Sequence, residues 1–183
     1  MGKLLLISGG NGSGKSRYAE ALISKTVGPR YYIATMEPQT EENRRRIGKH
    51  IAQRSGLNFV TLELPAHVGT APVTADSVVL LEDVSNLLGN TVFSAHCTPE
   101  DAWQDMLALQ KRCGLLVAVT ISGLSSHGYA GETAAYIDDL NTLNRRLFDL
   151  ADAAVTMKNN SPVWEKGAEH DIFEIPSGGP VHL

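Results

Sequence analysis

A glycine-rich segment near the start of the chain constrains the fold more than any other feature. Residues 9–16 read G-G-N-G-S-G-K-S and match the pattern G-x-x-x-x-G-K-[ST]. An apolar run at residues 3–8 precedes the segment, and an amphipathic stretch at residues 15–25 follows it. Glycines let backbone amides curl around a phosphate, and the N-terminus of a helix adds positive potential. The segment therefore predicts a phosphate-binding loop between a buried strand and a helix.

The last two residues of this loop carry the chemistry that phosphate transfer needs. In such loops the lysine reaches the β and γ phosphates and the hydroxyl binds Mg²⁺, which predicts these roles for Lys15 and Ser16. A dinucleotide-binding loop of the Rossmann type is the competing interpretation, but a Gly-Lys-Ser ending is not part of that fingerprint. The predicted nucleotide-binding residues of the loop are Gly9, Gly10, Asn11, Gly12, Ser13, Gly14, Lys15 and Ser16.

Strand-like and helix-like segments alternate along the chain. Apolar or β-branched runs predict strands at residues 3–8, 30–34, 57–62, 77–81, 115–121 and 153–157. Polar or amphipathic stretches predict helices at residues 15–25, 37–54, 99–112 and 132–151. Thr98 is the expected N-cap of the third helix, and the tail after Lys158 is expected to form a hairpin around Gly167.

This alternation predicts an α/β fold of the P-loop NTPase (RecA-like) type, with a mostly parallel sheet flanked by helices. The length of 183 residues suits a single nucleotide-binding domain. The formal net charge of −4 argues against nucleic acid as a main partner, because such partners usually need a basic face. No apolar stretch has the length of a membrane span. Cys97 and Cys113 form no metal-binding pattern, which favours a reducing, cytoplasmic compartment.

An acidic pair follows the strand expected at residues 77–81. P-loop proteins often place a carboxylate at such a strand end, where it holds Mg²⁺ or its water. Glu82 or Asp83 fits this role, and Glu82 is preferred. The alternative is that the pair is simply the polar end of a strand before a turn.

Several segments resemble one P-loop family, the bifunctional adenosylcobinamide kinase / adenosylcobinamide-phosphate guanylyltransferases of cobalamin biosynthesis. Residues 7–20 (ISGGNGSGKSRYAE) are similar to the opening of the family. Shorter similarities are YIAT at 32–35, RIGKH at 46–50, TLE at 61–63, LLE at 80–82, LNRRL at 143–147 and AD at 151–152. The resemblance is dense over the first half of the chain. It departs from the family after Thr120, where Ile121-Ser122-Gly123 replaces the usual N-E-V-G.

The resemblance implies two reactions. A nucleoside triphosphate, ATP or GTP, phosphorylates the aminopropanol hydroxyl of adenosylcobinamide, and a histidine then takes GMP from GTP and passes it to the new phosphate. His50 matches the guanylylated histidine, and a neutral imidazole suits a two-step nucleotidyl transfer. The remaining matched nucleotide-binding positions are Ala34, Thr35, Arg54, Glu63 and Glu82. The resemblance also implies a homo-oligomer, a trimer.

Two other interpretations stay open at this point. The chain fits a P-loop kinase for another small hydroxyl compound, without nucleotidyl transfer. It also fits a non-catalytic nucleotide-binding regulator derived from the family. The replaced N-E-V-G stretch favours both, because such loops commonly face the substrate.

Overall fold

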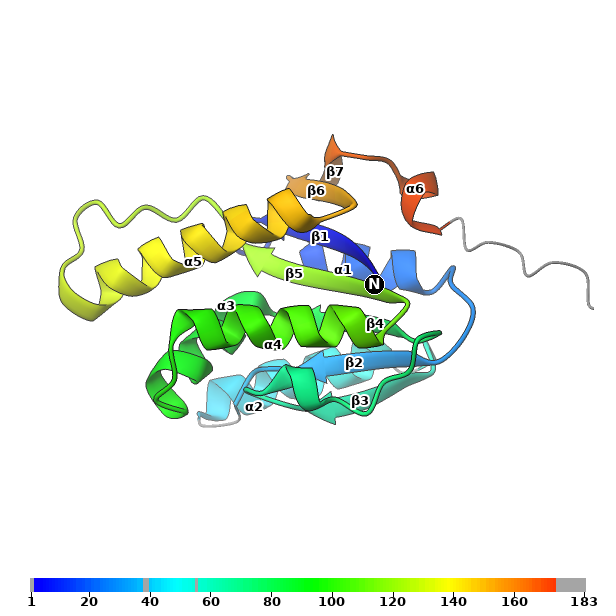
Figure 1. The fold of residues 1–183 in the computed structure, drawn as a ribbon, viewed down its shortest axis with the longest axis horizontal. Coiled ribbons are helices and arrows are strands. Elements are labelled where there is room, and N and C mark those ends of the chain that lie inside the picture. Colours follow the sequence, from blue (N-terminus) through cyan, green and yellow to red (C-terminus); the bar gives the residue numbers. More distant parts are fainter. Residues whose placement is uncertain (1, 38–39, 55, 174–183) are drawn as a thin grey trace, which may run out of the picture.

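The computed structural model describes residues 2–37, 40–54 and 56–173 (Figure 1). The strands are β1 (Lys3–Gly9), β2 (Arg30–Ala34), β3 (Phe59–Glu63), β4 (Val78–Glu82), β5 (Leu115–Ile121), β6 (Ala153–Lys158) and β7 (Ser161–Lys166). They form one 7-stranded sheet in the order β3-β2-β4-β5-β1-β6-β7. Every neighbouring pair is parallel except β6 and β7. The predicted fold class, a mostly parallel sheet flanked by helices, is confirmed.

Helices cover both faces of this sheet. The α-helices are α1 (Lys15–Ile23), α2 (Glu41–Arg54), α3 (Val84–Gly89), α4 (Pro99–Arg112), α5 (Gly131–Leu150) and α6 (Glu169–Phe173). Two short helical segments, η1 (Val68–Thr70) and η2 (Asn90–Ser94), connect them. Figure 1 shows α4 and α5 in front of the sheet and α1 behind it.

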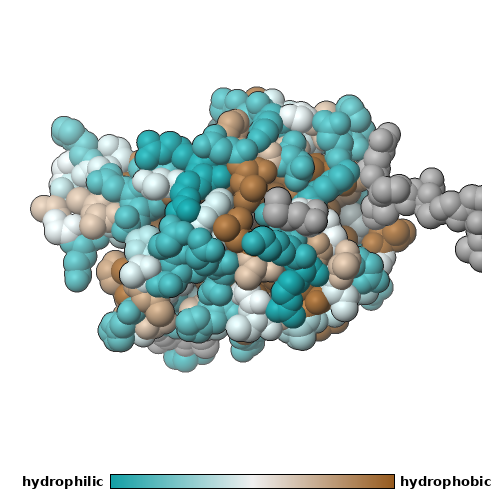
Figure 2. Space-filling model, in the orientation of Figure 1, coloured by the Kyte–Doolittle hydropathy of each residue, from teal (hydrophilic) through white to brown (hydrophobic). Residues whose placement is uncertain are grey.

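The hydrophobic core consists of two layers, one on each face of the sheet. Side chains of alternate strand positions, such as Leu4 and Leu6, pack against α3, α4 and α5. The intervening positions, such as Leu5 and Ile7, pack against α1 and α6. Because both faces are covered, the central strands read as continuous apolar runs, as parallel strands of α/β proteins usually do. Figure 2 shows a largely hydrophilic surface on the α4–α5 face, with a hydrophobic strip near its middle.

Two predicted elements need correction. The helix expected from residue 37 begins at Glu41, because the Thr40 hydroxyl accepts a hydrogen bond from the Asn43 amide at 3.0 Å and caps it. The expected hairpin turns at Asn159 and Asn160 rather than around Gly167. Both asparagines have positive φ, 50° and 61°, which suits the turn of a two-residue hairpin. The short helices α3 and α6 were not predicted.

The remaining expected elements are present with boundaries shifted by a few residues at most. Thr98 caps α4 as expected, and its side chain and that of Asp101 form a reciprocal capping box. Among the described residues, no helix combines the length and the apolar character that a membrane crossing requires.

Candidate functional site

The glycine-rich loop leads from the end of β1 into the first turn of α1. Gly14 is the N-cap of α1 with φ of 88°, a left-handed conformation that favours glycine. A Cβ atom at this position would lie 2.6 Å from Oδ1 of Asn160, in the turn between β6 and β7. The backbone conformation therefore favours glycine at residue 14, and a larger residue would also have to displace the Asn160 side chain. The β6–β7 turn therefore lies next to the glycine-rich loop.

The ammonium group of Lys15 lies against the loop itself. Its Nζ donates hydrogen bonds to the carbonyl oxygens of Gly9 at 3.0 Å and Gly10 at 2.7 Å. Burial lowers the pKa of Lys15 from its ordinary value, while the nearby carboxylates of Asp83 and Glu82 raise it. A half-buried cation is thus held at the loop, close to two carboxylates.

Ser16 and Glu82 meet between α1 and the end of β4. The Ser16 hydroxyl donates a hydrogen bond to Oε1 of Glu82. The other carboxylate oxygen, Oε2, is buried and has no hydrogen-bond partner among the described residues. Burial raises the pKa of Glu82 to about 8, and the Ser16 hydrogen bond partly opposes this shift. A hard cation such as Mg²⁺ prefers oxygen ligands, so this hydroxyl and this unsatisfied carboxylate fit such an ion.

The neighbouring carboxylate serves a different purpose. Asp83 is the N-cap of α3, where its Oδ1 accepts hydrogen bonds from the Asn86 amide at 2.7 Å and the Ser85 hydroxyl at 2.6 Å. Of the two acids predicted at this strand end, the structure therefore engages Asp83 in capping and places Glu82 against the phosphate loop.

Three predicted residues share one row of the sheet. Ala34 is in register with Glu63 of β3 on one side and with Glu82 of β4 on the other. Thr35, which follows Ala34, is fully buried, and its hydroxyl oxygen lies 2.9 Å from the carbonyl oxygens of both Glu82 and Asp83. Since all three strands end here, these residues lie together at the carboxyl edge of the sheet, where ligands of α/β proteins commonly bind.

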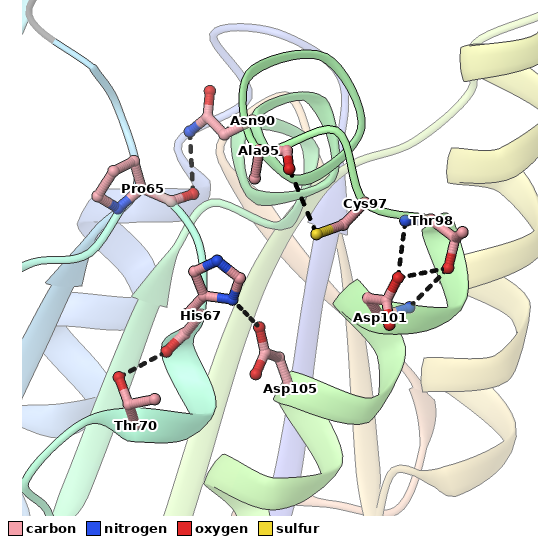
Figure 3. A network of polar contacts seen from close by, with 9 residues as sticks. All are labelled: Pro65, His67, Thr70, Asn90, Ala95, Cys97, Thr98, Asp101 and Asp105. Carbon is pink, nitrogen blue, oxygen red and sulfur yellow. Dashed lines mark hydrogen bonds and ion pairs between the residues drawn. The ribbon is translucent and has the colours of Figure 1, made fainter.

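Polar contacts fix the loops that leave this edge (Figure 3). Nδ2 of Asn90 donates hydrogen bonds to the carbonyl oxygens of Thr35 at 2.7 Å and Pro65 at 3.0 Å. In Figure 3, His67 faces Asp105 of α4, and Nδ1 of His67 lies 3.8 Å from Oδ2 of Asp105. The segments that follow β2 and β3 are therefore tied to η2 and α4.

The predicted residues His50 and Arg54 both belong to α2. Their backbone is helical, but their side chains lie outside the described part of the chain. Arg44 and Arg45, from the basic cluster around His50, are exposed on the same helix.

The sequence interpretation missed Asn160 as a neighbour of the phosphate loop. An Asn-Asn pair between two strand-like segments is a recognisable turn pattern, because asparagine tolerates left-handed conformations. That pattern would have located the hairpin. Its contact with Gly14 would still have required knowledge that β6 lies beside β1 in the sheet.

Comparison with known proteins gives consistent matches. The family model described as cobinamide kinase / cobinamide phosphate guanyltransferase, CobU, matches residues 5–163. The chain is 32% identical over 112 residues to the bifunctional adenosylcobalamin biosynthesis protein CobU of Salmonella typhimurium LT2, covering 59% of this chain and 60% of that protein. It is 37% identical over 93 residues to the CobU protein of Escherichia coli K12, covering 49% of this chain and 50% of that protein. The chain thus matches only part of the length of each of these relatives.

Solved structures support the fold. One is described as a prototypical ATPase from the type III secretion system of pathogenic bacteria, with a TM-score of 0.52 and 11% sequence identity. That match covers 86% of this chain and 52% of the other. At this identity the likeness concerns the fold alone. The family match over residues 5–163 is more specific, and by it the chain belongs to the CobU family.

Proposed function

We propose that this protein is a nucleotide-dependent kinase and guanylyltransferase that acts on adenosylcobinamide in cobalamin biosynthesis. The observation that carries the proposal is the assembly of Lys15, Ser16 and the buried Glu82 around the glycine-rich loop. Membership of the CobU family supports the choice of substrates. The proposed nucleotide is GTP or ATP, with Mg²⁺.

In the kinase step, the aminopropanol hydroxyl oxygen of the acceptor forms a bond to the γ-phosphorus. The bond between that phosphorus and the β–γ bridging oxygen breaks, so the nucleoside diphosphate leaves, and the hydroxyl proton is released. Lys15 would leave the carbonyl oxygens of Gly9 and Gly10 to bind phosphate oxygens. Ser16 and Glu82 would hold Mg²⁺, which supplies charge neutralisation on the phosphates. Phosphoryl transfer of this kind depends mainly on positioning and electrostatics.

In the guanylyl step, an imidazole nitrogen of His50 would attack the α-phosphorus of GTP and release pyrophosphate. The phosphate of the acceptor would then attack the same phosphorus, form a pyrophosphate linkage and free the histidine. In each of the two transfers one bond to the α-phosphorus forms and one breaks, so no further reactant is needed. Arg44 and Arg45 are exposed on the same helix and would add positive charge for the triphosphate, and Arg44 also pairs with Glu41 at 3.3 Å.

Phosphate transfer to cobinamide tests the kinase step. Lys15→Ala should lower the rate about a hundredfold or more, the scale on which one preorganised charge-stabilising donor acts. Lys25→Ala is the matched control, because Lys25 is an exposed lysine paired with Glu169 away from the loop. A wild-type protein that binds nucleotide and transfers phosphate to no corrinoid would contradict the proposal. It would favour a kinase for another hydroxyl compound or a nucleotide-binding regulator.

Labelling with α-³²P GTP and Mg²⁺ tests the guanylyl step. The expected product is an acid-labile, base-stable adduct that is absent in His50→Ala and present in His170→Ala, a variant of an exposed histidine on α6. Absence of label on the wild type, under conditions where GTP binds, rules out a covalent step. Label that persists in His50→Ala moves the nucleophile to another residue.

We also propose that the chain acts as a single nucleotide-binding domain and assembles as a homo-oligomer, a trimer by resemblance to the family. The support is the continuous 7-stranded sheet and the family match over residues 5–163. Light scattering on the purified protein measures the assembly directly, and a monomeric mass at micromolar concentration would contradict it.

A further inference from the structure

A row of hydroxyl groups crosses the sheet just before the phosphate loop. Ser8 of β1 is in register with Thr120 of β5 on one side and with Thr156 of β6 on the other. Oγ of Ser8 lies 3.2 Å from Oγ1 of Thr156. Three adjacent strands of the sheet thus carry a hydroxyl at the same level.

A groove of about 550 Å³ opens between this row and helix α5. Ser8 and Thr120 line it from the sheet, Ser122 from the following loop, and Asn144 from α5. Asn144 connects α5 to β5 by two hydrogen bonds. Its Oδ1 accepts from the Thr120 hydroxyl at 2.7 Å, and its Nδ2 donates to the Ile121 carbonyl oxygen at 2.9 Å. These hydrogen bonds between α5 and β5 therefore fix one side of the groove.

The rim of the groove carries polar groups with unused bonding capacity. The Ser122 hydroxyl and the Asp149 carboxylate have no hydrogen bond or ion pair among the described residues. Among the described residues, the guanidinium of Arg145 donates one hydrogen bond, from Nη2 to the Thr142 hydroxyl at 3.1 Å. Phe148 also lines the groove and is 39% exposed, and Nζ of Lys166 lies 5.8 Å from the centroid of its ring. Donors, acceptors and an apolar surface thus face the same space.

The groove begins where the phosphate loop begins. Ser8 directly precedes Gly9, and the Ser122 amide donates a hydrogen bond to the Gly9 carbonyl oxygen at 3.1 Å. A molecule bound here lies beside the loop that holds the phosphates. An acceptor hydroxyl must reach within about 3–3.5 Å of the transferred phosphorus, so an acceptor site is expected next to this loop.

We infer that this groove binds the amide-bearing edge of the corrinoid acceptor. The inference rests on the proposed function, which supplies the acceptor. A primary carboxamide offers one acceptor and two donors, which matches the mixed set formed by Ser122, Arg145 and Asp149. The apolar surface of the corrin ring matches Phe148. The volume lies in the range of small-molecule sites, and it would take an edge of the ring rather than the whole corrinoid.

Equilibrium binding to the full chain tests this inference, with cobinamide followed by its visible absorption and a fluorescent nucleotide measured in parallel. Ser122→Ala/Arg145→Ala should weaken cobinamide binding about tenfold or more, since each removed hydrogen bond to a charged or polar partner contributes on that scale. Nucleotide affinity should stay at the wild-type value, which also shows that the variant is folded. The matched control is Asp138→Ala, an exposed charge on α5 that does not line the groove.

The outcomes separate the inference from the function on which it rests. If the wild type binds and phosphorylates cobinamide but the double variant binds it equally well, the groove is not the acceptor site and the proposed function stands. If the wild type binds nucleotide and no cobinamide, the proposed function fails, and the inference fails with it. Selective loss of cobinamide affinity in the groove variant alone supports both.

Discussion

Glu82 is the residue whose chemistry the tertiary structure alters most. Its side chain is enclosed beside the phosphate loop, and burial raises its pKa to about 8. The nearby carboxylates of Asp83 and Glu20 add to this shift, while the Ser16 hydrogen bond and Lys15 oppose it. Near neutral pH, and without a cation, this carboxyl group holds its proton in the folded state.

This shift predicts a pH dependence of stability in the metal-free protein. The folded pKa of about 8 lies above the ordinary value of 4.5, so the folded state binds the proton more tightly. The free energy of unfolding should therefore fall as pH rises between these values, by about 1.4 kcal/mol per pH unit at the steepest. Urea titrations in EDTA measure the slope. Glu82→Gln should remove this component, and Glu63→Gln, an exposed carboxyl at the same edge, should keep it.

Gly14 gives a second prediction at the residue scale. Gly14→Ala should destabilise the fold, by about 1–2 kcal/mol for the left-handed backbone alone, with a further cost from the 2.6 Å approach to Asn160 Oδ1. In an Asn160→Ala background the same substitution should cost less, because the contact is gone. Gly48→Ala is the control, since nothing lies within 4 Å of a Cβ there and the position is helical. That variant should be neutral or more stable in thermal unfolding.

At the scale of elements, the predicted and observed helix boundaries agree best where the sequence contains recognisable capping residues. Helix α4 begins where Thr98 and Asp101 cap each other and ends with basic residues in its last turn. The short helix α3 has no reciprocal capping box and begins at the N-cap Asp83. The sequence alone did not indicate that Asp83 caps a helix. Explicit caps predict helix ends because they satisfy backbone groups locally.

The capping box of α4 gives the prediction at this scale. Thr98→Ala removes the acceptor of the Asp101 amide and the donor to its carboxylate. The free energy of unfolding should fall by about 1 kcal/mol, the usual contribution of such a cap. Chemical denaturation measures it. Thr133→Ala, at an exposed position in the first turn of α5, should change stability by less than half as much; equal losses in both variants would contradict the capping explanation.

At the scale of the whole molecule, two apolar layers enclose the sheet and leave the two cysteines in different surroundings. Cys113 is 2% exposed and belongs to the layer under α4. Burial raises its pKa to about 12. Cys97 is only half-buried, near η2.

Thiol labelling therefore reports the integrity of the core. At pH 8 a thiol reagent should modify Cys97 in the native protein and leave Cys113 unmodified, because the thiolate is the reactive form. Mass spectrometry of the labelled peptides measures this. Cys97→Ser should take up no label until denaturant is added. Rapid labelling of Cys113 in the native variant would mean that the layer under α4 opens readily.

The sequence by itself determined the glycine-rich turn between β1 and α1, the order of most strands and helices, and the class of fold. These features depend on neighbours along the chain: glycines and Lys15 at fixed spacing, apolar periodicity, and the Thr98 cap. It also predicted Glu82 at a strand end. What it left open were the burial of that carboxyl group, the contact of Asn160 with Gly14, and the hydroxyl row at Ser8. Each of these depends on which strands lie side by side and in what register, and only the tertiary structure decides that.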